Sequence, residues 1–213
     1  MTLVKVCGIT NLEDARHAIE CGADELGFNF YKGSKRYIAP QVARQIIDRL
    51  PISSGNIGVF VDEAIENVLE TAGFVGLDGI QLHGGEGPEY VSLLRERSKR
   101  FVVKAFRVSP AFEMHSVWDW VVDYHLFDAY SDSGLGGTGA TFDWESFAAD
   151  IALYAPETAY LAGGLTPENV AKAIRIVRPY AVDVASGVES SPGKKDPAKV
   201  AAFIDAVRKA DIS

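Results

Sequence analysis

Two side chains that can move protons stand at the ends of apolar runs in this sequence. Cys7 closes the run Leu3–Cys7, and Asp128 follows an apolar and aromatic run that starts at Tyr124. A thiol in such a place is either a small buried hydrophobic group or, once deprotonated, a base or nucleophile. A carboxylate there is either the cap of the next turn or a general acid that burial helps to keep protonated. The residue types suggest acid–base chemistry and leave both structural alternatives open.

Two glycine-containing turns follow the last two apolar runs of the chain. They are Gly163-Gly164 and Ser186-Gly187. Glycine has no Cβ, so backbone N–H groups in such turns approach an anion closely, and a following helix adds its positive end. The alternative is that the glycines only make tight turns. We favour the first interpretation and expect Gly163, Gly164, Ser186 and Gly187 to bind phosphate.

Arg36, Gln81 and His83 are polar candidates of a different kind. The planar guanidinium of Arg36 lies in a loop and has the shape to hold a carboxylate through two parallel hydrogen bonds, although a charged loop tip is usually only solvated. Gln81 and His83 share one face of a predicted strand, so we expect both to line the same pocket. The histidines are scattered, and His83 with Glu86 has no further close ligand, so the sequence predicts no metal site.

Short runs rich in Val, Ile, Leu and Phe alternate with amphipathic segments along the whole chain. Such runs are typical of strands buried on both faces, and the segments between them have the periodicity of helices that cover a sheet. We expect strands at Leu3–Cys7, Glu25–Phe30, Asn56–Val61, Gly79–His83, Phe101–Phe106, Tyr124–Asp128, Thr158–Ala162 and Ala181–Ala185. We expect helices to begin at four capping residues, Thr10, Ser109, Thr166 and Asp196.

The spacing of the expected strands favours a (β/α)8 barrel, also called a TIM barrel. Most strands begin about 23 residues after the previous one, which is close to the least that a strand, a helix and two turns occupy. Eight such units fill the 213 residues without a linker, so we predict an α/β fold with a single domain over residues 1–213. A doubly wound open sheet is the alternative, but it calls for a glycine-rich loop after the first strand, where the chain has Cys7-Gly8-Ile9-Thr10.

The active site of such a barrel forms at the carboxyl ends of its strands. This rule brings the candidates together, because most of them end a predicted strand or lie in the loop after it. Extra residues lie in two loops, one with Arg36 and one after Asp128, and the second, Tyr130–Asp143, holds four glycines and is interpreted as a lid. Within the barrel, Lys5 and Asp183 are expected to form a buried ion pair, since the first and eighth strands are neighbours.

The composition excludes several classes of protein. The chain has 47% hydrophobic and 23% charged residues, which are ordinary globular values, and it lacks an apolar run long enough for a membrane helix. A net charge of −8 argues against a nucleic-acid partner but not against a small anionic ligand, which meets only local donors. We therefore expect a small-molecule partner, no nucleic acid, no membrane, and a monomer or homodimer. Two cysteines and the absence of a basic and apolar leader favour the cytoplasm.

Eight motifs follow one another in order at barrel spacing. They lie in the segments Lys5–Thr10, Gly27–Ile38, Gly58–Val61, Gln81–Gly84, Leu126–Asp128, Gly136–Trp144, Gly163–Val170 and Asp183–Asp196. Together they resemble the phosphoribosylanthranilate isomerase family of tryptophan biosynthesis over essentially the whole chain. The resemblance implies a ketol-isomerase that carries out the Amadori rearrangement of N-(5-phosphoribosyl)anthranilate to 1-(2-carboxyphenylamino)-1-deoxyribulose 5-phosphate.

The resemblance also implies a role for each candidate at a matching motif position. Asp128 would be the general acid that protonates the ring oxygen as the furanose opens, and Cys7 would be the base that removes the proton from C2 of the sugar. Arg36 would hold the anthranilate carboxylate, and the two glycine-containing turns would bind the phosphate. The reaction implied in this way needs neither a cofactor nor a metal.

Two alternatives to this function stay open. One is another phosphosugar isomerase with the same fold, against which Cys7 argues because the related histidine-pathway isomerase uses two aspartates. The other is a barrel that binds a phosphosugar without turning it over, against which the joint presence of Cys7, Arg36 and Asp128 argues.

Overall fold

The computed structural model confirms the predicted barrel. Eight parallel strands pair in sequence order, and β8 closes the sheet by pairing with β1. The strands are β1 (Leu3–Cys7), β2 (Glu25–Asn29), β3 (Gly55–Phe60), β4 (Gly79–Leu82), β5 (Phe101–Val108), β6 (Tyr124–Ala129), β7 (Ala159–Leu161) and β8 (Ala181–Val184). Every predicted strand is present, with its ends displaced by no more than two residues.

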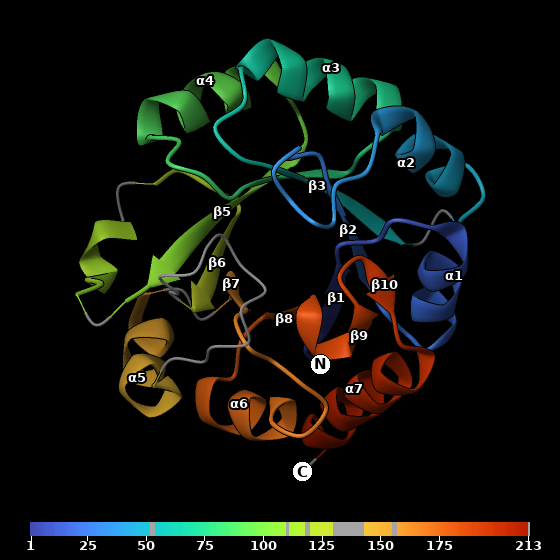
Figure 1. Cartoon of the computed structure of the whole chain (residues 1–213). Helices are drawn as coiled ribbons and strands as arrows, with labels where there is room; N and C mark the ends of the chain where they lie inside the picture. Colours follow the sequence, from blue (N-terminus) through green and yellow to red (C-terminus); the bar gives the residue numbers. More distant parts are fainter. Residues whose placement is uncertain (52–53, 110, 118–119, 130–142, 155–156, 213) are drawn as a thin grey trace.

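The described residues form seven α-helices, which surround the strands as a ring (Figure 1). They are α1 (Leu12–Glu20), α2 (Pro40–Ile47), α3 (Ile65–Val75), α4 (Pro88–Arg97), α5 (Trp144–Tyr154), α6 (Val170–Val177) and α7 (Pro197–Ala210). The described residues also form short elements, namely the 3-10 helices η1 (Met114–Val117) and η2 (Ser186–Val188) and the two-stranded hairpin β9 (Glu189–Ser191) and β10 (Lys194–Lys195). The hairpin follows β8 and leads into α7.

The structure describes residues 1–51, 54–109, 111–117, 120–129, 143–154 and 157–212. The predicted lid, Tyr130–Asp143, lies outside this part of the chain except for Asp143. No helix within the described ranges is both long and apolar enough to cross a membrane.

The capping residues of the first and last helices show that a tertiary contact can replace a cap predicted from the sequence. Asp196 is confirmed as the cap of α7, because its carboxylate accepts hydrogen bonds from two backbone N–H groups of the first turn. The prediction at Thr10 is wrong by one residue. Asn11 caps α1, and the hydroxyl of Thr10 instead donates to the carbonyl of Gly193 in the hairpin, at 2.5 Å.

The other two predicted helix starts are wrong. After β7, Thr166 opens a turn, and α6 begins only at Val170; the side chain of Asn169 stabilises this turn by accepting from the Thr166 N–H at 2.8 Å. After β5, the described residues form the short helix η1 and not the α-helix expected from Ser109. A proline after a capping residue thus marks a chain reversal without deciding whether an α-helix follows at once.

Charged groups inside the barrel are paired. Lys5 and Asp183 form the predicted ion pair, with 3.0 Å between Nζ and Oδ1. Burial disfavours the charged ammonium, but the neighbouring carboxylate outweighs this and the pKa of Lys5 is raised. The hydroxyl of Tyr160 donates to the carboxylate of Glu25, 2.9 and 3.0 Å from its two oxygens. Burial of this carboxylate raises the pKa of Glu25 to about 7.

We expect the Glu25→Gln variant to flatten the pH dependence of the stability of this protein. The pKa of Glu25 is about 7 in the folded chain against an ordinary value of 4.5, so the folded state binds the proton more tightly. The resulting stabilisation is complete below the ordinary pKa and is lost as the pH rises through the folded one, a difference of about 3 kcal/mol. Glutamine keeps an acceptor for Tyr160 but does not titrate.

Urea unfolding at several pH values between about 5 and 8 measures this difference. The free energy of unfolding should fall further with rising pH in the parent chain than in the variant. Glu20→Gln, which neutralises an exposed carboxylate of α1, is the control and should leave the pH profile unchanged. Parallel profiles for the parent chain and Glu25→Gln would contradict the prediction.

Candidate active site

The predicted site residues gather at one end of the barrel. Cys7 is the last residue of β1, His83 follows β4 directly, and Asp128 stands one residue before the end of β6. The turns at 163–164 and 186–187 follow β7 and β8. Because all eight strands are parallel, their carboxyl ends meet at the same mouth, which is where barrel enzymes place their chemistry.

The thiol of Cys7 is packed against the neighbouring strand. Cys7 pairs with Gly27 of β2, and a Cβ added to Gly27 would lie only 2.6 Å from the sulfur atom. Burial raises the pKa of Cys7 above its ordinary value of 9.0, although the positive charges of Lys5 and Lys195 act in the opposite direction. In the free protein the thiol is therefore protonated at neutral pH, with two cations close enough to stabilise a thiolate.

The side chain of Arg36 reaches the end of β1 across Gly8. Gly8 has a φ of +79°, a backbone conformation that side chains with a Cβ rarely adopt, and an added Cβ would lie 2.5 Å from Cδ of Arg36. Glycine is thus needed here both for the turn and for the passage of the arginine. With 15% of its side chain exposed, Arg36 is not the solvated loop tip that its position in the sequence also allowed.

Glu189, at the start of β9, holds Arg36 from the other side. Nε and Nη2 of the arginine donate to Oε1 and Oε2 of the glutamate, each at 2.8 Å. Burial alone would raise the pKa of Glu189, but its hydrogen bond to Arg36 and the charge of Lys195 outweigh this and lower it. The hydrogen bond to Glu189 also raises the pKa of Arg36. This is the bidentate geometry in which guanidinium–carboxylate pairs are strongest.

Lys195, in β10, joins this pair to the end of β1. Its ammonium donates to the carbonyl oxygens of Cys7 at 2.6 Å and Ala185 at 3.1 Å, and to Glu189 Oε1 at 3.1 Å. The side chain is buried, which lowers the pKa of Lys195. Sequence reasoning assigned no role to Glu189 or Lys195, although both lie in the last of the eight motifs.

On the other side of the mouth, a chain of hydrogen bonds runs from Gln81 through His83 to Asp128. Nε2 of Gln81 lies 2.9 Å from Nδ1 of His83, and Nε2 of His83 lies 3.3 Å from Oδ2 of Asp128. The imidazole of His83 therefore lies between the amide of Gln81 and the carboxylate of Asp128, with Nε2 facing the carboxylate. One oxygen of Asp128 is thereby held and the other has no partner within the described residues.

The two glycine-containing turns complete the mouth. Gly163 and Gly164 have φ angles of +85° and +61°, and a Cβ on Gly163 would collide with the backbone of Ala129. A Cβ on Gly187 would collide with the carbonyl oxygen of Leu165, so the turns after β7 and β8 pack directly on each other. Within the described ranges, the backbone N–H groups of Gly163 and Gly164 have no acceptor. They are free to bind an anion.

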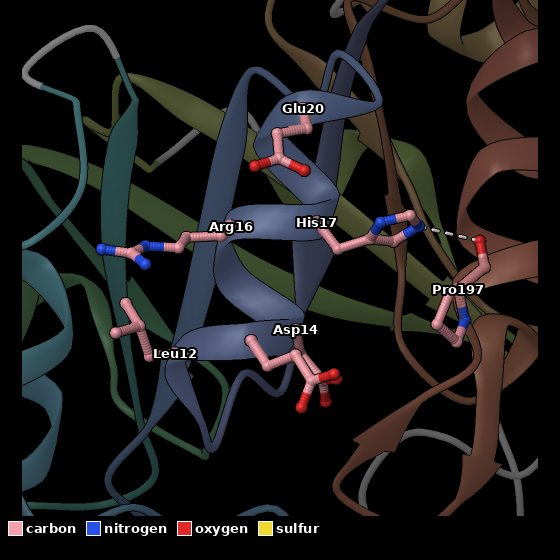
Figure 2. A pocket seen from close by; sticks show the side chains of 7 residues that line it. Leu12, Asp14, Arg16, His17, Glu20 and Pro197 are labelled. Carbon is pink, nitrogen blue, oxygen red and sulfur yellow. Dashed lines mark hydrogen bonds between the residues drawn. The ribbon is translucent and has the colours of Figure 1, made fainter.

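A surface pocket elsewhere on the molecule is separate from this mouth. It lies on the outer side of α1 beside the start of α7, where Nε2 of His17 is 3.0 Å from the carbonyl oxygen of Pro197 (Figure 2). Its other lining residues are Leu12, Glu13, Asp14, Arg16 and Glu20. Three of these are acidic, which makes the pocket a poor place for an anionic ligand.

Comparison with known proteins shows to which family the chain is related. The family model described as N-(5'phosphoribosyl)anthranilate (PRA) isomerase matches residues 4–206. The N-(5'-phosphoribosyl)anthranilate isomerase of Citrifermentans bemidjiense is 49% identical over 209 residues, which are 98% of each chain.

Solved structures of proteins with the same activity are also similar to this chain. A phosphoribosyl anthranilate isomerase in complex with reduced 1-(o-carboxyphenylamino)-1-deoxyribulose 5-phosphate has a TM-score of 0.86 at 42% identity, covering 98% of this chain and all of the other. Monomers generated from the dimeric phosphoribosylanthranilate isomerase of Thermotoga maritima give the same TM-score, identity and coverage. The family that the sequence motifs resemble is therefore confirmed. This chain belongs to the N-(5'-phosphoribosyl)anthranilate isomerase family.

Proposed function

We propose that Asp128 and Cys7 carry out the acid and base steps of the Amadori rearrangement that converts N-(5-phosphoribosyl)anthranilate to 1-(2-carboxyphenylamino)-1-deoxyribulose 5-phosphate. Family membership confirms the isomerase activity expected from the sequence. The observation that carries the assignment of roles is the arrangement of the mouth. A carboxylate oriented by His83 stands on one side, and a thiol flanked by cations stands on the other.

Asp128 acts first, as the general acid. It donates a proton to the furanose oxygen as the bond from C1 to that oxygen breaks, and the nitrogen lone pair forms a Schiff base with C1. Because Nε2 of His83 contacts Oδ2, the proton is delivered from Oδ1, and the contact of His83 with Gln81 orients the imidazole.

Cys7 acts second, as the general base. The thiolate takes the proton from C2, the electron pair of the C–H bond forms the C1–C2 double bond, and the electrons of the C1–nitrogen double bond return to nitrogen. The resulting enolamine then tautomerises to the ketone. Lys5 and Lys195 favour the thiolate electrostatically, and every step moves protons without a change in the overall oxidation state.

The remaining predicted residues bind the two anionic groups of the substrate. Arg36 contacts the anthranilate carboxylate, and the free N–H groups of Gly163 and Gly164, together with Ser186 and Gly187, surround the phosphate. Gln81 and His83 line the space between these groups. In the proposed complex, the reacting C1 and C2 atoms lie between the acid and the base.

The proposal also includes the domain organisation, the cellular compartment and the partner of the enzyme. We place the reaction in a single domain of residues 1–213 that acts in the cytoplasm, with a small-molecule substrate. The Thermotoga maritima relative is described as dimeric. Sedimentation of this chain distinguishes the monomer from the homodimer, both of which the sequence allows.

We expect Asp128→Asn to reduce turnover by a factor of about 10² to 10⁴, which is the usual contribution of a general acid. Asparagine has the shape of aspartate and still accepts from His83, so the variant should unfold at the temperature of the parent chain. Turnover is followed by the fluorescence of the anthranilate group, with chromatography to separate the rearranged product from anthranilate released by hydrolysis. Addition of EDTA should change nothing, since only protons move.

Asp150→Asn is the matched control for this experiment. Asp150 is an exposed carboxylate on α5, and its neutralisation should leave the rate unchanged. Near-normal turnover of Asp128→Asn would remove Asp128 from the acid step. Loss of activity in both variants would mean that the assay reports a general effect of charge.

We expect Cys7→Ala to lose most of the activity, because alanine cannot take the proton from C2 of the sugar. Turnover is measured with the same fluorescence assay as for Asp128→Asn. Cys21→Ala, at the end of α1, is the matched control and should behave as the parent chain. Full activity of Cys7→Ala would contradict the assignment.

A further inference from the structure

The contact with Glu189 leaves one edge of Arg36 free. A guanidinium has two edges that can each bind a carboxylate through two hydrogen bonds, the side edge with Nε and one Nη, and the end with both Nη atoms. Glu189 takes the side edge through Nε and Nη2, with both distances at 2.8 Å. Within the described part of the chain, Nη1 has no partner, so the end of the guanidinium that carries both Nη atoms is available for a second carboxylate.

Glu189 also balances the charge at this side of the mouth. Its carboxylate is shared by Arg36 and by the buried ammonium of Lys195, so the three groups together carry one net positive charge. That charge suits a substrate carboxylate. Without Glu189, two cations would stand unpaired in a largely buried place, and the long side chain of Arg36 would lose the only side-chain partner that it has among the described residues.

Gly8 and Gly193 further restrict the position of the Arg36 side chain. Its Cδ would lie only 2.5 Å from a Cβ added to Gly8, and Gly193 of the hairpin donates its N–H to Oε1 of Glu189 at 3.3 Å. The glutamate is thus held by its own hairpin and by Lys195. Because it binds the guanidinium through two hydrogen bonds, it also restricts the orientation of Arg36. A fork held in this way loses little conformational entropy when it binds a ligand.

We propose that Glu189 is a positioning residue that sets the specificity of this isomerase for a carboxylate-bearing substrate: by binding the side edge of Arg36, it aims the free end of the guanidinium at the aryl carboxylate. This inference rests on the proposed function, because it requires Arg36 to bind that carboxylate. In this arrangement Glu189 acts on the substrate only through Arg36. Its effect must therefore disappear when Arg36 is absent.

A double-mutant cycle with two substrates tests the proposal. Glu189→Gln, Arg36→Met and the double variant are assayed with N-(5-phosphoribosyl)anthranilate and with N-(5-phosphoribosyl)aniline, which lacks the carboxylate. Glutamine presents an N–H₂ group to one of the arginine donors and breaks the pair. Glu189→Gln should raise KM for the carboxylated substrate about 10-fold or more, the usual effect of losing an oriented charge-assisted contact, with kcat changed less than about threefold.

Two comparisons then separate positioning from a general structural role. KM for the aniline substrate should be little changed by Glu189→Gln, and adding this substitution to Arg36→Met should raise KM by less than about twofold, since the two act as a unit. Equal effects of Glu189→Gln on both substrates, or full additivity with Arg36→Met, would overturn the inference. If Arg36→Met leaves KM for the carboxylated substrate unchanged, the proposed role of Arg36 fails instead.

Two further variants guard against loss of folding. Glu189→Asp keeps the charge that balances Lys195 but shortens the reach to Arg36, so it should raise KM selectively for the carboxylated substrate while the protein stays folded. Asp24→Asn is the matched control: it breaks an ion pair of 2.9 Å with Arg208 at the opposite end of the barrel and should leave KM for both substrates unchanged. A Glu189→Asp variant that behaves as the parent chain would also overturn the proposal.

Discussion

The closure of the barrel between β1 and β8 is the constraint on which the rest of this molecule depends. In the register of the two strands Lys5 stands beside Asp183, and their buried side chains form an ion pair of 3.0 Å. A buried charge without a partner is costly, so the pair favours this register over one shifted along the strand. The same closure sets the end of β1 against the chain that leaves β8, and so joins Cys7 to the hairpin of Glu189 and Lys195.

The electrostatics of the mouth differ from those of the whole chain. The net charge is −8, yet the end of the barrel that meets the substrate holds Arg36 and Lys195 around a single carboxylate. On the opposite side, Asp128 contacts the imidazole of His83, and no lysine or arginine among the described residues forms an ion pair with it. A substrate with a phosphate and a carboxylate therefore meets positive groups and free N–H groups first, and the one acid it must meet is oriented by His83.

The sequence was sufficient to predict the elements that bury runs of apolar side chains. All eight strands followed from short apolar runs, and the pair of Lys5 with Asp183 followed from the neighbourhood of the first and last strands. The cap at Thr10 was wrong because its hydroxyl found an acceptor in Gly193, far along the chain. The contact of Arg36 with Glu189 could not be predicted from the sequence for a similar reason. The two residues lie 153 positions apart, and a charged residue in a loop belongs to no periodic pattern that would indicate a buried contact.

What the sequence by itself determined is the barrel, the end at which chemistry occurs, and the residue types that the rearrangement needs, because strand spacing and strand ends are local properties of the chain. Only the tertiary structure decided how those residues are oriented. The contact of His83 with Asp128, the occupied edge of Arg36 and the raised pKa of Cys7 each depend on groups that folding brings within hydrogen-bonding or Coulombic range. Such forces act over a few ångströms in space, and the sequence records distance only along the chain.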